Sequence, residues 1–163
     1  MNTALDSRNT VCGFSDRVCK NFEVLADAKE DGKDVHLVTA LITSLLGVIV
    51  FPVQKVKESK FAAFNELSLQ DLQQAGWPAW QYQVGTSADL GHLLLRLRNA
   101  ISHRRIVFSG EERELNAVKV TFSDRQQGAV KDNWRASIWA SELLAFKLLV
   151  AKRLYQIEAQ TEA

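Results

Sequence analysis

The sequence predicts a mainly α-helical protein, an antiparallel bundle of four to five helices with a small β-hairpin at about residues 105–123. Three observations lead to this class. Apolar residues recur at helical spacing in several long segments. The uncharged stretch 37–53 is apolar on nearly all sides, as the central helix of a bundle must be. Strand-like alternation occurs within 105–123, where Val118, Val120 and Phe122 alternate with polar residues.

The chain has 163 residues, of which 47% are hydrophobic. We therefore expect one domain, residues 1–163, with one apolar core. In the first half, helices are expected at about 7–28 and 35–50, the second ending before Phe51 and Pro52. Ser68 is expected to cap a short third helix.

Two further segments complete the predicted bundle. The aromatic cluster Trp77, Trp80 and Tyr82 is expected to cover the core, with base stacking as the alternative. The last helix is expected to be capped by Asp132 or Asn133 and to run to about residue 157, with its lysines, Lys147 among them, pointing outward.

The apolar stretch 37–53 also raises the question of a membrane. It is shorter than the roughly 20 residues that a membrane-spanning helix needs. We expect a buried helix and no membrane partner, with a membrane span as a minor alternative. The first thirty residues lack an apolar leader segment, so we expect a cytoplasmic protein.

The functional residues are expected on a helix within residues 89–105. Leu90, Leu93, Leu94, Leu97, Ala100 and Ile101 fall on one side of that helix. The opposite side carries His92, Arg96, Asn99 and His103, with Arg98 and Ser102 on its flank. The helix is expected to begin with a capping box at Thr86, or with Ser87 as the cap.

The polar side of this helix has the residue types that suit a phosphate diester. A histidine accepts or donates a proton near neutral pH, and a guanidinium binds phosphate in a bidentate manner. Asn99 is four residues from His103 and is expected to orient its imidazole or to hold a substrate hydroxyl. No metal is needed if the nucleophile is the 2′-hydroxyl of RNA. The alternative is a solvated helix face without a function.

Charge and motifs exclude several other classes of protein. The net charge of +1 disfavours a general nucleic-acid coat protein, so RNA contact is expected at a local patch. The sequence has no CxxC, no HExxH and no glycine-rich phosphate loop. We therefore expect no metal site and no cofactor.

At Arg98-Asn99-Ala100-Ile101-Ser102-His103 the sequence resembles the HEPN (higher eukaryotes and prokaryotes nucleotide-binding) family. The shared pattern is an arginine, a polar residue, three more residues and a histidine near the end of a helix. Together with the apolar run Leu-Thr-Ala-Leu-Ile-Thr-Ser-Leu-Leu-Gly-Val-Ile-Val-Phe-Pro, it is similar to a plasmid-borne bacterial subgroup.

The resemblance implies a homodimer that cleaves RNA without a metal and leaves a cyclic phosphate and a 5′-hydroxyl. It implies that Arg98 stabilises the phosphate, that Asn99 positions it and that His103 is the acid or base. Toxin or phage-defence biology and an inhibitory partner protein (an antitoxin) are also implied. The alternative within the family is a helical dimer that binds nucleic acid or a partner protein without catalysis.

The neighbours of these three residues are expected to bind RNA phosphates: His92, Arg96, Ser102, Arg104 and Arg105. On an ideal helix Arg96 is nearly in line with His103, whereas Arg98 is about 140° away. Arg98 is predicted as the main arginine, with Arg96 in support. The tyrosine whose nucleotidylation silences some family toxins is replaced here by Arg104 and Arg105, which argues against that form of control.

Overall fold

The computed structural model describes residues 10–56, 58–111 and 113–159. Its helices are α2 (Val11–Glu30), α3 (Leu37–Leu45), α4 (Phe51–Lys55), α5 (Glu58–Asn65), α6 (Leu69–Gln74), α7 (Leu90–Ser102) and α8 (Ala140–Ala159), and a π-helical turn, η1 (Leu46–Val50), joins α3 to α4. Its strands are β1 (Gln81–Val84), β2 (Ile106–Phe108), β3 (Lys119–Asp124) and β4 (Trp134–Trp139). The predicted mainly α-helical class is confirmed.

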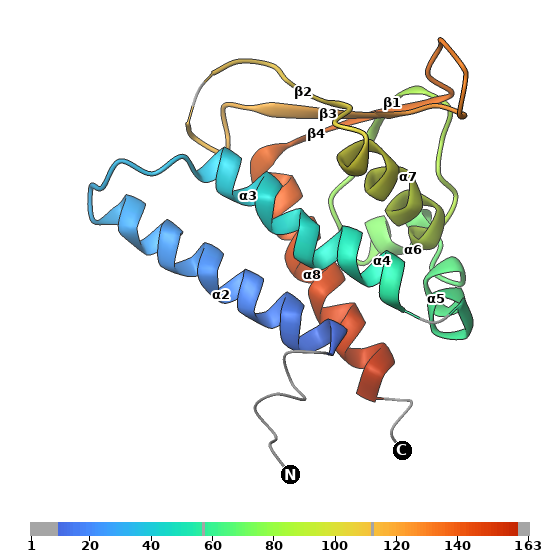
Figure 1. Ribbon diagram of the computed structural model, residues 1–163, viewed down its shortest axis with the longest axis horizontal. Coiled ribbons are helices and arrows are strands. Elements are labelled where there is room, and N and C mark those ends of the chain that lie inside the picture. Colours follow the sequence, from blue (N-terminus) through green and yellow to red (C-terminus); the bar gives the residue numbers. More distant parts are fainter. Residues whose placement is uncertain (1–9, 57, 112, 160–163) are drawn as a thin grey trace.

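The long helices and the strands form separate parts of the structure (Figure 1). Helices α2, α3 and α8 pack on one another, and η1 contacts α2, α7 and α8. The strands form one antiparallel sheet in the order β1-β4-β3-β2. Helix α7 packs against β3 on one side and α5 on the other. This arrangement places the end of the predicted motif helix beside the sheet.

The sheet corrects two predictions. The expected two-stranded hairpin is present as β2 and β3, with Ile106 opposite Phe122, but it forms one half of a four-stranded sheet. The last helix does not begin at Asp132 or Asn133, because 134–139 is strand β4 and pairs with β3 along its whole length. Trp134 and Ile138, assigned to the helix by their i, i+4 spacing, are instead buried strand residues.

The apolar segment is a continuous helix over Leu37–Lys55 and passes through Pro52. The predicted end before Phe51 is therefore wrong. A proline ring collides with the carbonyl four residues earlier in a regular α-helix. Here the π-helical turn ends at Val50, two residues before Pro52, and Phe51 N–H bonds to the carbonyl of Leu46, five residues back. The segment is long and apolar enough to cross a membrane, but half of its most apolar stretch is buried inside the protein, which fits a core helix.

Helix α2 crosses the π-helical turn at a very short separation. A Cβ added to Gly47 would lie 2.5 Å from Cγ2 of Val18, so a larger residue would push the two helices apart. The buried hydroxyl of Ser15 donates to the Gly47 carbonyl at 2.8 Å. In the π-helical pattern the donor to this carbonyl would be residue 52, five positions later, but proline has no N–H, so the Ser15 hydroxyl satisfies the carbonyl instead.

The predicted aromatic cluster is part of the core. Trp80 is buried and meets Phe146 edge-on with ring centroids 5.3 Å apart, and its ring lies 6.0 Å from that of Phe122. Trp77 also meets Phe146 edge-on. These rings join the sheet to α8, and the prediction that the cluster covers the core is confirmed.

Lys147 differs from its prediction, because its side chain points into the protein. Its exposed fraction is 0%, and its Nζ donates to the hydroxyl of Ser44 at 3.2 Å and lies 4.0 Å from the ring centroid of Phe22. Burial lowers the pKa of Lys147, and the nearby Cys19 and Glu23 oppose this only in part. A buried ammonium group with a neutral hydroxyl as its bonding partner opposes folding.

Replacement of Lys147 by methionine is expected to raise the free energy of unfolding by about 1–3 kcal/mol, because the charge is lost and the volume is kept. The unfolded chain binds the Lys147 proton more tightly than the folded chain does. The stability difference between the variant and the wild type should therefore shrink as the pH rises from the lowered folded-state pKa towards the ordinary value of 10.5. Urea unfolding of both proteins across this pH range measures the stability difference.

The matched control for this prediction is Lys152→Met, which changes an exposed lysine of the same helix. This control should change the free energy of unfolding by no more than about 0.5 kcal/mol at every pH. A destabilised Lys147→Met protein would show that the ammonium group contributes to folding.

Candidate functional site

Helix α7 presents the predicted site residues and begins at a side-chain cap. Asp89 is the N-cap, and its carboxylate accepts from the N–H of His92 at 2.8 Å. The predicted caps, Thr86 and Ser87, lie outside the helix, and the buried hydroxyl of Ser87 accepts from the indole N–H of Trp134. The predicted apolar side is buried as a set: Leu90, Leu93, Leu94, Leu97, Ala100 and Ile101.

The end of α7 is a Schellman turn built around an arginine. His103 is the C-cap, and Arg104 adopts a left-handed conformation with φ 57°. The N–H of Arg105 bonds to the carbonyl of Ala100 at 2.8 Å, and the N–H of Arg104 bonds to that of Ile101 at 3.1 Å. Glycine is usual at this position, and arginine there costs roughly 1 kcal/mol. The turn leaves His103 exposed and sends Arg105 back towards the sheet.

A buried carboxylate, Asp124, bonds to the side chains of α7. It ends strand β3, and its side chain is 4% exposed. Oδ2 accepts from Nη1 of Arg96 at 2.9 Å and from Nδ2 of Asn99 at 3.0 Å. Oδ1 accepts from the N–H of Arg125 at 2.9 Å and from Nη1 of Arg105 at 3.4 Å. One carboxylate thus joins α7, the turn after it and the loop after β3.

Burial alone would raise the pKa of Asp124. The hydrogen bonds from Asn99, Arg96 and the backbone N–H of Arg125, together with the charge of Arg96, outweigh this effect and hold the pKa below its usual value. Asp124 is therefore ionised at neutral pH and neutralises part of the arginine charge beside it.

This network uses several of the predicted residues in a way that the sequence analysis did not expect. Arg96 is bound to Asp124 and Asn133, and its Nε donates to Nε2 of His92 at 3.2 Å. Asn99, predicted to orient the His103 imidazole, instead donates to Asp124 and accepts from Nη1 of Arg98 at 2.9 Å. Arg98 is thereby tethered to the same network through Asn99.

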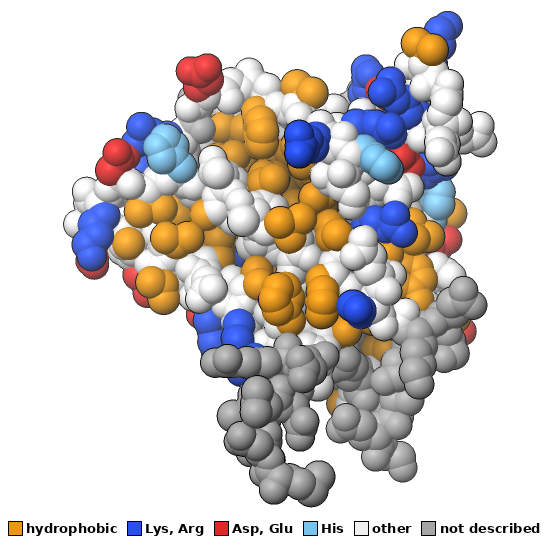
Figure 2. Space-filling model, viewed as in Figure 1, with side chains coloured by type: hydrophobic (Ala, Val, Ile, Leu, Met, Phe, Trp, Pro, Cys, Tyr) orange, Lys and Arg blue, Asp and Glu red, His pale blue; other side chains and the backbone are white. Residues whose placement is uncertain are grey.

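The remaining predicted residues lie at the end of the helix. Ser102, His103 and Arg104 are exposed, and Arg98 and Arg105 are half-buried. His103 and Arg105 line an open cavity of about 490 Å³, whose other wall is the β3–β4 loop from Arg125 to Ala129. Basic side chains gather over α7 and the base of this loop (Figure 2). The arrangement offers an imidazole and guanidiniums to an anionic ligand of nucleotide size.

Asp124 and Arg125 are the functional candidates that the sequence analysis missed. A signal for Asp124 was present, because Val118, Val120 and Phe122 alternate inward and Asp124 is the next position in that series. Within the part of the chain that the structure describes, no group of three His, Cys, Asp or Glu side chains is arranged to hold a metal ion.

Replacement of Asp124 by asparagine is expected to lower the free energy of unfolding by about 2–4 kcal/mol at pH 7, because Arg96 loses its buried counter-charge. The stability that Asp124 contributes is complete above the ordinary pKa of 3.8 and is lost as the pH falls through the lower folded-state pKa. Urea unfolding at neutral and acidic pH measures both effects.

The matched control is Asp132→Asn, since Asp132 pairs with the more exposed Arg135 near the same loop. Asp132→Asn should change the free energy of unfolding by no more than about 1 kcal/mol. Equal effects of the two variants would contradict the role given to Asp124.

Comparison with known families matches the family model HEPN pEK499 p136 over residues 3–160. Neither the comparison with curated proteins nor the comparison with solved structures gave a match. The matched range covers nearly the whole chain, including α7 and the sheet. The resemblance that rests on Arg98, Asn99 and His103 is therefore confirmed at the level of the family. The chain belongs to the HEPN family, in the group HEPN pEK499 p136.

Proposed function

We propose that the chain is a metal-independent RNA endonuclease whose site comprises Arg98, Asn99 and His103. Membership of the HEPN family supports a nucleotide-binding or ribonuclease-like domain. The observation that carries the finer assignment is the place of His103, an exposed imidazole on the wall of a basic cavity of about 490 Å³. An imidazole in such a place is accessible to a ribose–phosphate chain.

The proposed reaction is an attack of RNA on its own backbone. His103 takes the proton of a ribose 2′-hydroxyl, whose oxygen then forms a bond to the adjacent phosphorus. The bond to the 5′ oxygen breaks, and that oxygen takes a proton from an acid. The products are a 2′,3′-cyclic phosphate and a 5′-hydroxyl. Arg98 stabilises the negative charge that builds on the phosphate oxygens.

Arg98 is a better candidate than Arg96 for that role. The guanidinium of Arg96 is bound to Asp124 and Asn133, so it acts as a positioning group within the protein. Arg98 donates from Nη1 to a neutral amide, that of Asn99, and keeps other donors for a phosphate. Arg104 and Arg105 are proposed to bind neighbouring phosphates.

The acid in this reaction is proposed to come from a second copy of the chain. His92 accepts from Arg96, which leaves His103 as the histidine at the cavity among the described residues. Strand β2 is an edge strand that begins three residues after His103, and Val107 and Phe108 on it are 65% and 43% exposed. Pairing of these edges would satisfy their unpaired backbone groups, cover part of both side chains and bring two motifs together.

The biology proposed for this nuclease is that of a toxin or a phage-defence ribonuclease in the cytoplasm, restrained by an inhibitory partner protein. Family membership is what supports this setting. A second function, a non-catalytic dimer that binds RNA or a protein, is favoured by one observation. Asn99 bonds to Asp124 rather than to His103, so the imidazole lacks the orienting partner that the sequence analysis expected.

We expect purified protein to cleave total RNA or tRNA in EDTA, and His103→Ala to reduce the rate at least 100-fold, because the variant lacks the base. The wild-type products should carry a cyclic phosphate and a 5′-hydroxyl. Gel electrophoresis of the RNA, with end-group analysis, measures both.

The matched control is His36→Ala, which removes an exposed histidine at the start of α3 and should leave the rate unchanged. Wild-type protein that binds RNA as a folded dimer without cleaving any substrate would favour the non-catalytic function. Cleavage by wild type and His103→Ala alike would place the activity elsewhere.

A further inference from the structure

The buried ammonium group of Lys147 lies directly behind a cavity that the proposed nuclease site does not use. The cavity, of about 510 Å³, is formed between α2 and α3. Ser44 and Phe22, the two residues that contact Nζ of Lys147, are also part of its wall. The wall also includes Val18, Leu25, Asp34, His36 and Ala40.

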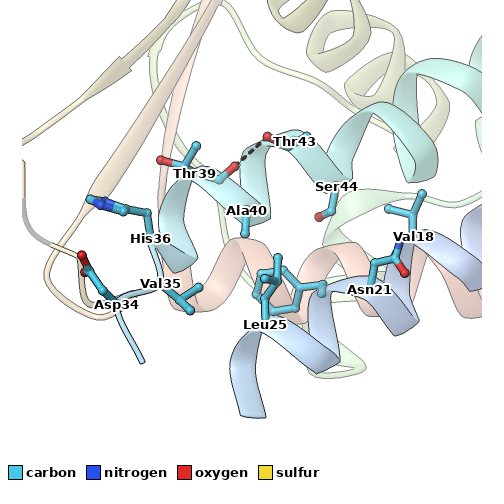
Figure 3. Close-up of a pocket in the computed structure, with 11 residues that line it drawn as sticks. Val18, Asn21, Leu25, Asp34, Val35, His36, Thr39, Ala40, Thr43 and Ser44 are labelled. Carbon is cyan, nitrogen blue, oxygen red and sulfur yellow. Dashed lines mark hydrogen bonds between the residues drawn. The ribbon is translucent and has the colours of Figure 1, made fainter. Parts of the chain in front are cut away.

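Figure 3 shows how the wall is divided. Ala40 and Ser44 point from α3 towards α2, whose Val18 and Leu25 face them across the space. Asp34 and His36 lie at one end of the cavity. The interior is therefore mostly apolar, with the Ser44 hydroxyl as the polar group next to Lys147.

Cys19 and Glu23 lie near enough to favour the charge of Lys147, but they offset the effect of its burial only in part. None of the ion pairs among the described residues includes Lys147. Its ammonium group has three N–H donors, and its contacts are one hydroxyl and the face of one ring. A buried cation in this state attracts an anion strongly, because little water competes for it.

We propose that this cavity binds a small amphipathic monocarboxylate. The carboxylate accepts a hydrogen bond from the Ser44 hydroxyl, which now donates to the carbonyl of Leu41 at 2.6 Å and accepts from Lys147. Rotation of the hydroxyl hydrogen towards the ligand keeps the bond from Lys147. The aromatic or aliphatic body of the ligand fills the space between Val18, Leu25 and Ala40.

The lining favours a monocarboxylate over a phosphate or a nucleotide. A phosphate dianion is usually bound by several cations or by an arginine fork. The residues that line this cavity include no lysine and no arginine, and a single buried lysine, Lys147, lies behind them. Asp34 at the end of the cavity is acidic and would repel further negative charge, although it is paired with Arg113. The ligand expected here therefore differs in class from the RNA expected at His103.

The proposal is tested by calorimetric titration of the full chain with phenylacetate and hexanoate, and with the matching neutral amides, phenylacetamide and hexanamide. At least one carboxylate should bind the wild type at least tenfold more tightly than its amide. In Lys147→Met this preference should disappear. In Lys152→Met, which changes an exposed lysine of the same helix, it should remain.

A second variant tests the cavity without touching the lysine. Ala40→Phe places a ring in the space between α2 and α3. It should weaken the binding of the carboxylate and of its amide alike, each by at least tenfold. Failure of all four compounds to bind the wild type would overturn the proposal. Equal binding of acid and amide, or a preference that survives in Lys147→Met, would overturn it as well.

Discussion

The carboxylate of Asp124 is the interaction on which the geometry of the site depends. It is buried at the end of β3 and binds groups from three places: helix α7, the turn that follows it and the β3–β4 loop. An ionised carboxylate with an exposed fraction of 4% is stable only if several donors surround it. Arg96, Asn99 and Arg105 supply those donors, and their positions are fixed as a result.

This constraint separates the arginines of the motif into two kinds. Arg96 and Arg105 form ion pairs with Asp124, which neutralises part of their charge. Arg96 also hydrogen-bonds to Asn133 and His92. Arg98 and Arg104 form none of the ion pairs among the described residues. Asn99 links the two kinds, because it donates to Asp124 and accepts from Arg98. Through Asn99, Arg98 is tied to the carboxylate network although it is in none of the ion pairs among the described residues.

Local patterns predicted the parts of the fold that depend on near neighbours. The buried side of α7 and the β2–β3 pairing were predicted correctly, since both follow from periodicity within a few residues. Strand β4 was assigned to a helix because Trp134 and Ile138 are four residues apart, which fits a helix face as well as a strand. Its long-range pairing with β3 decided between them.

The contacts of the site also depend on residues that are far apart in the sequence, so local patterns could not predict them. The sequence places His92, Arg96, Asn99 and His103 on one side of a helix, but the acid that binds Arg96 and Asn99, Asp124, lies 25 residues beyond Asn99. Its contact with α7 depends on how β3 packs against that helix, which helical spacing does not reveal. Lys147 was placed outward because lysine is rarely buried, and the hydroxyl of Ser44 that it meets is 103 residues away.

A double-mutant cycle on Arg96 and Asp124 tests the central role of the carboxylate most directly. The free energies of unfolding of the wild type, Arg96→Ala, Asp124→Ala and the double variant are measured in urea. If the two side chains form one unit, the double variant is more stable than the sum of the single losses predicts, by at least about 1 kcal/mol. Losses that add to within about 0.5 kcal/mol would show that Asp124 does not organise the site.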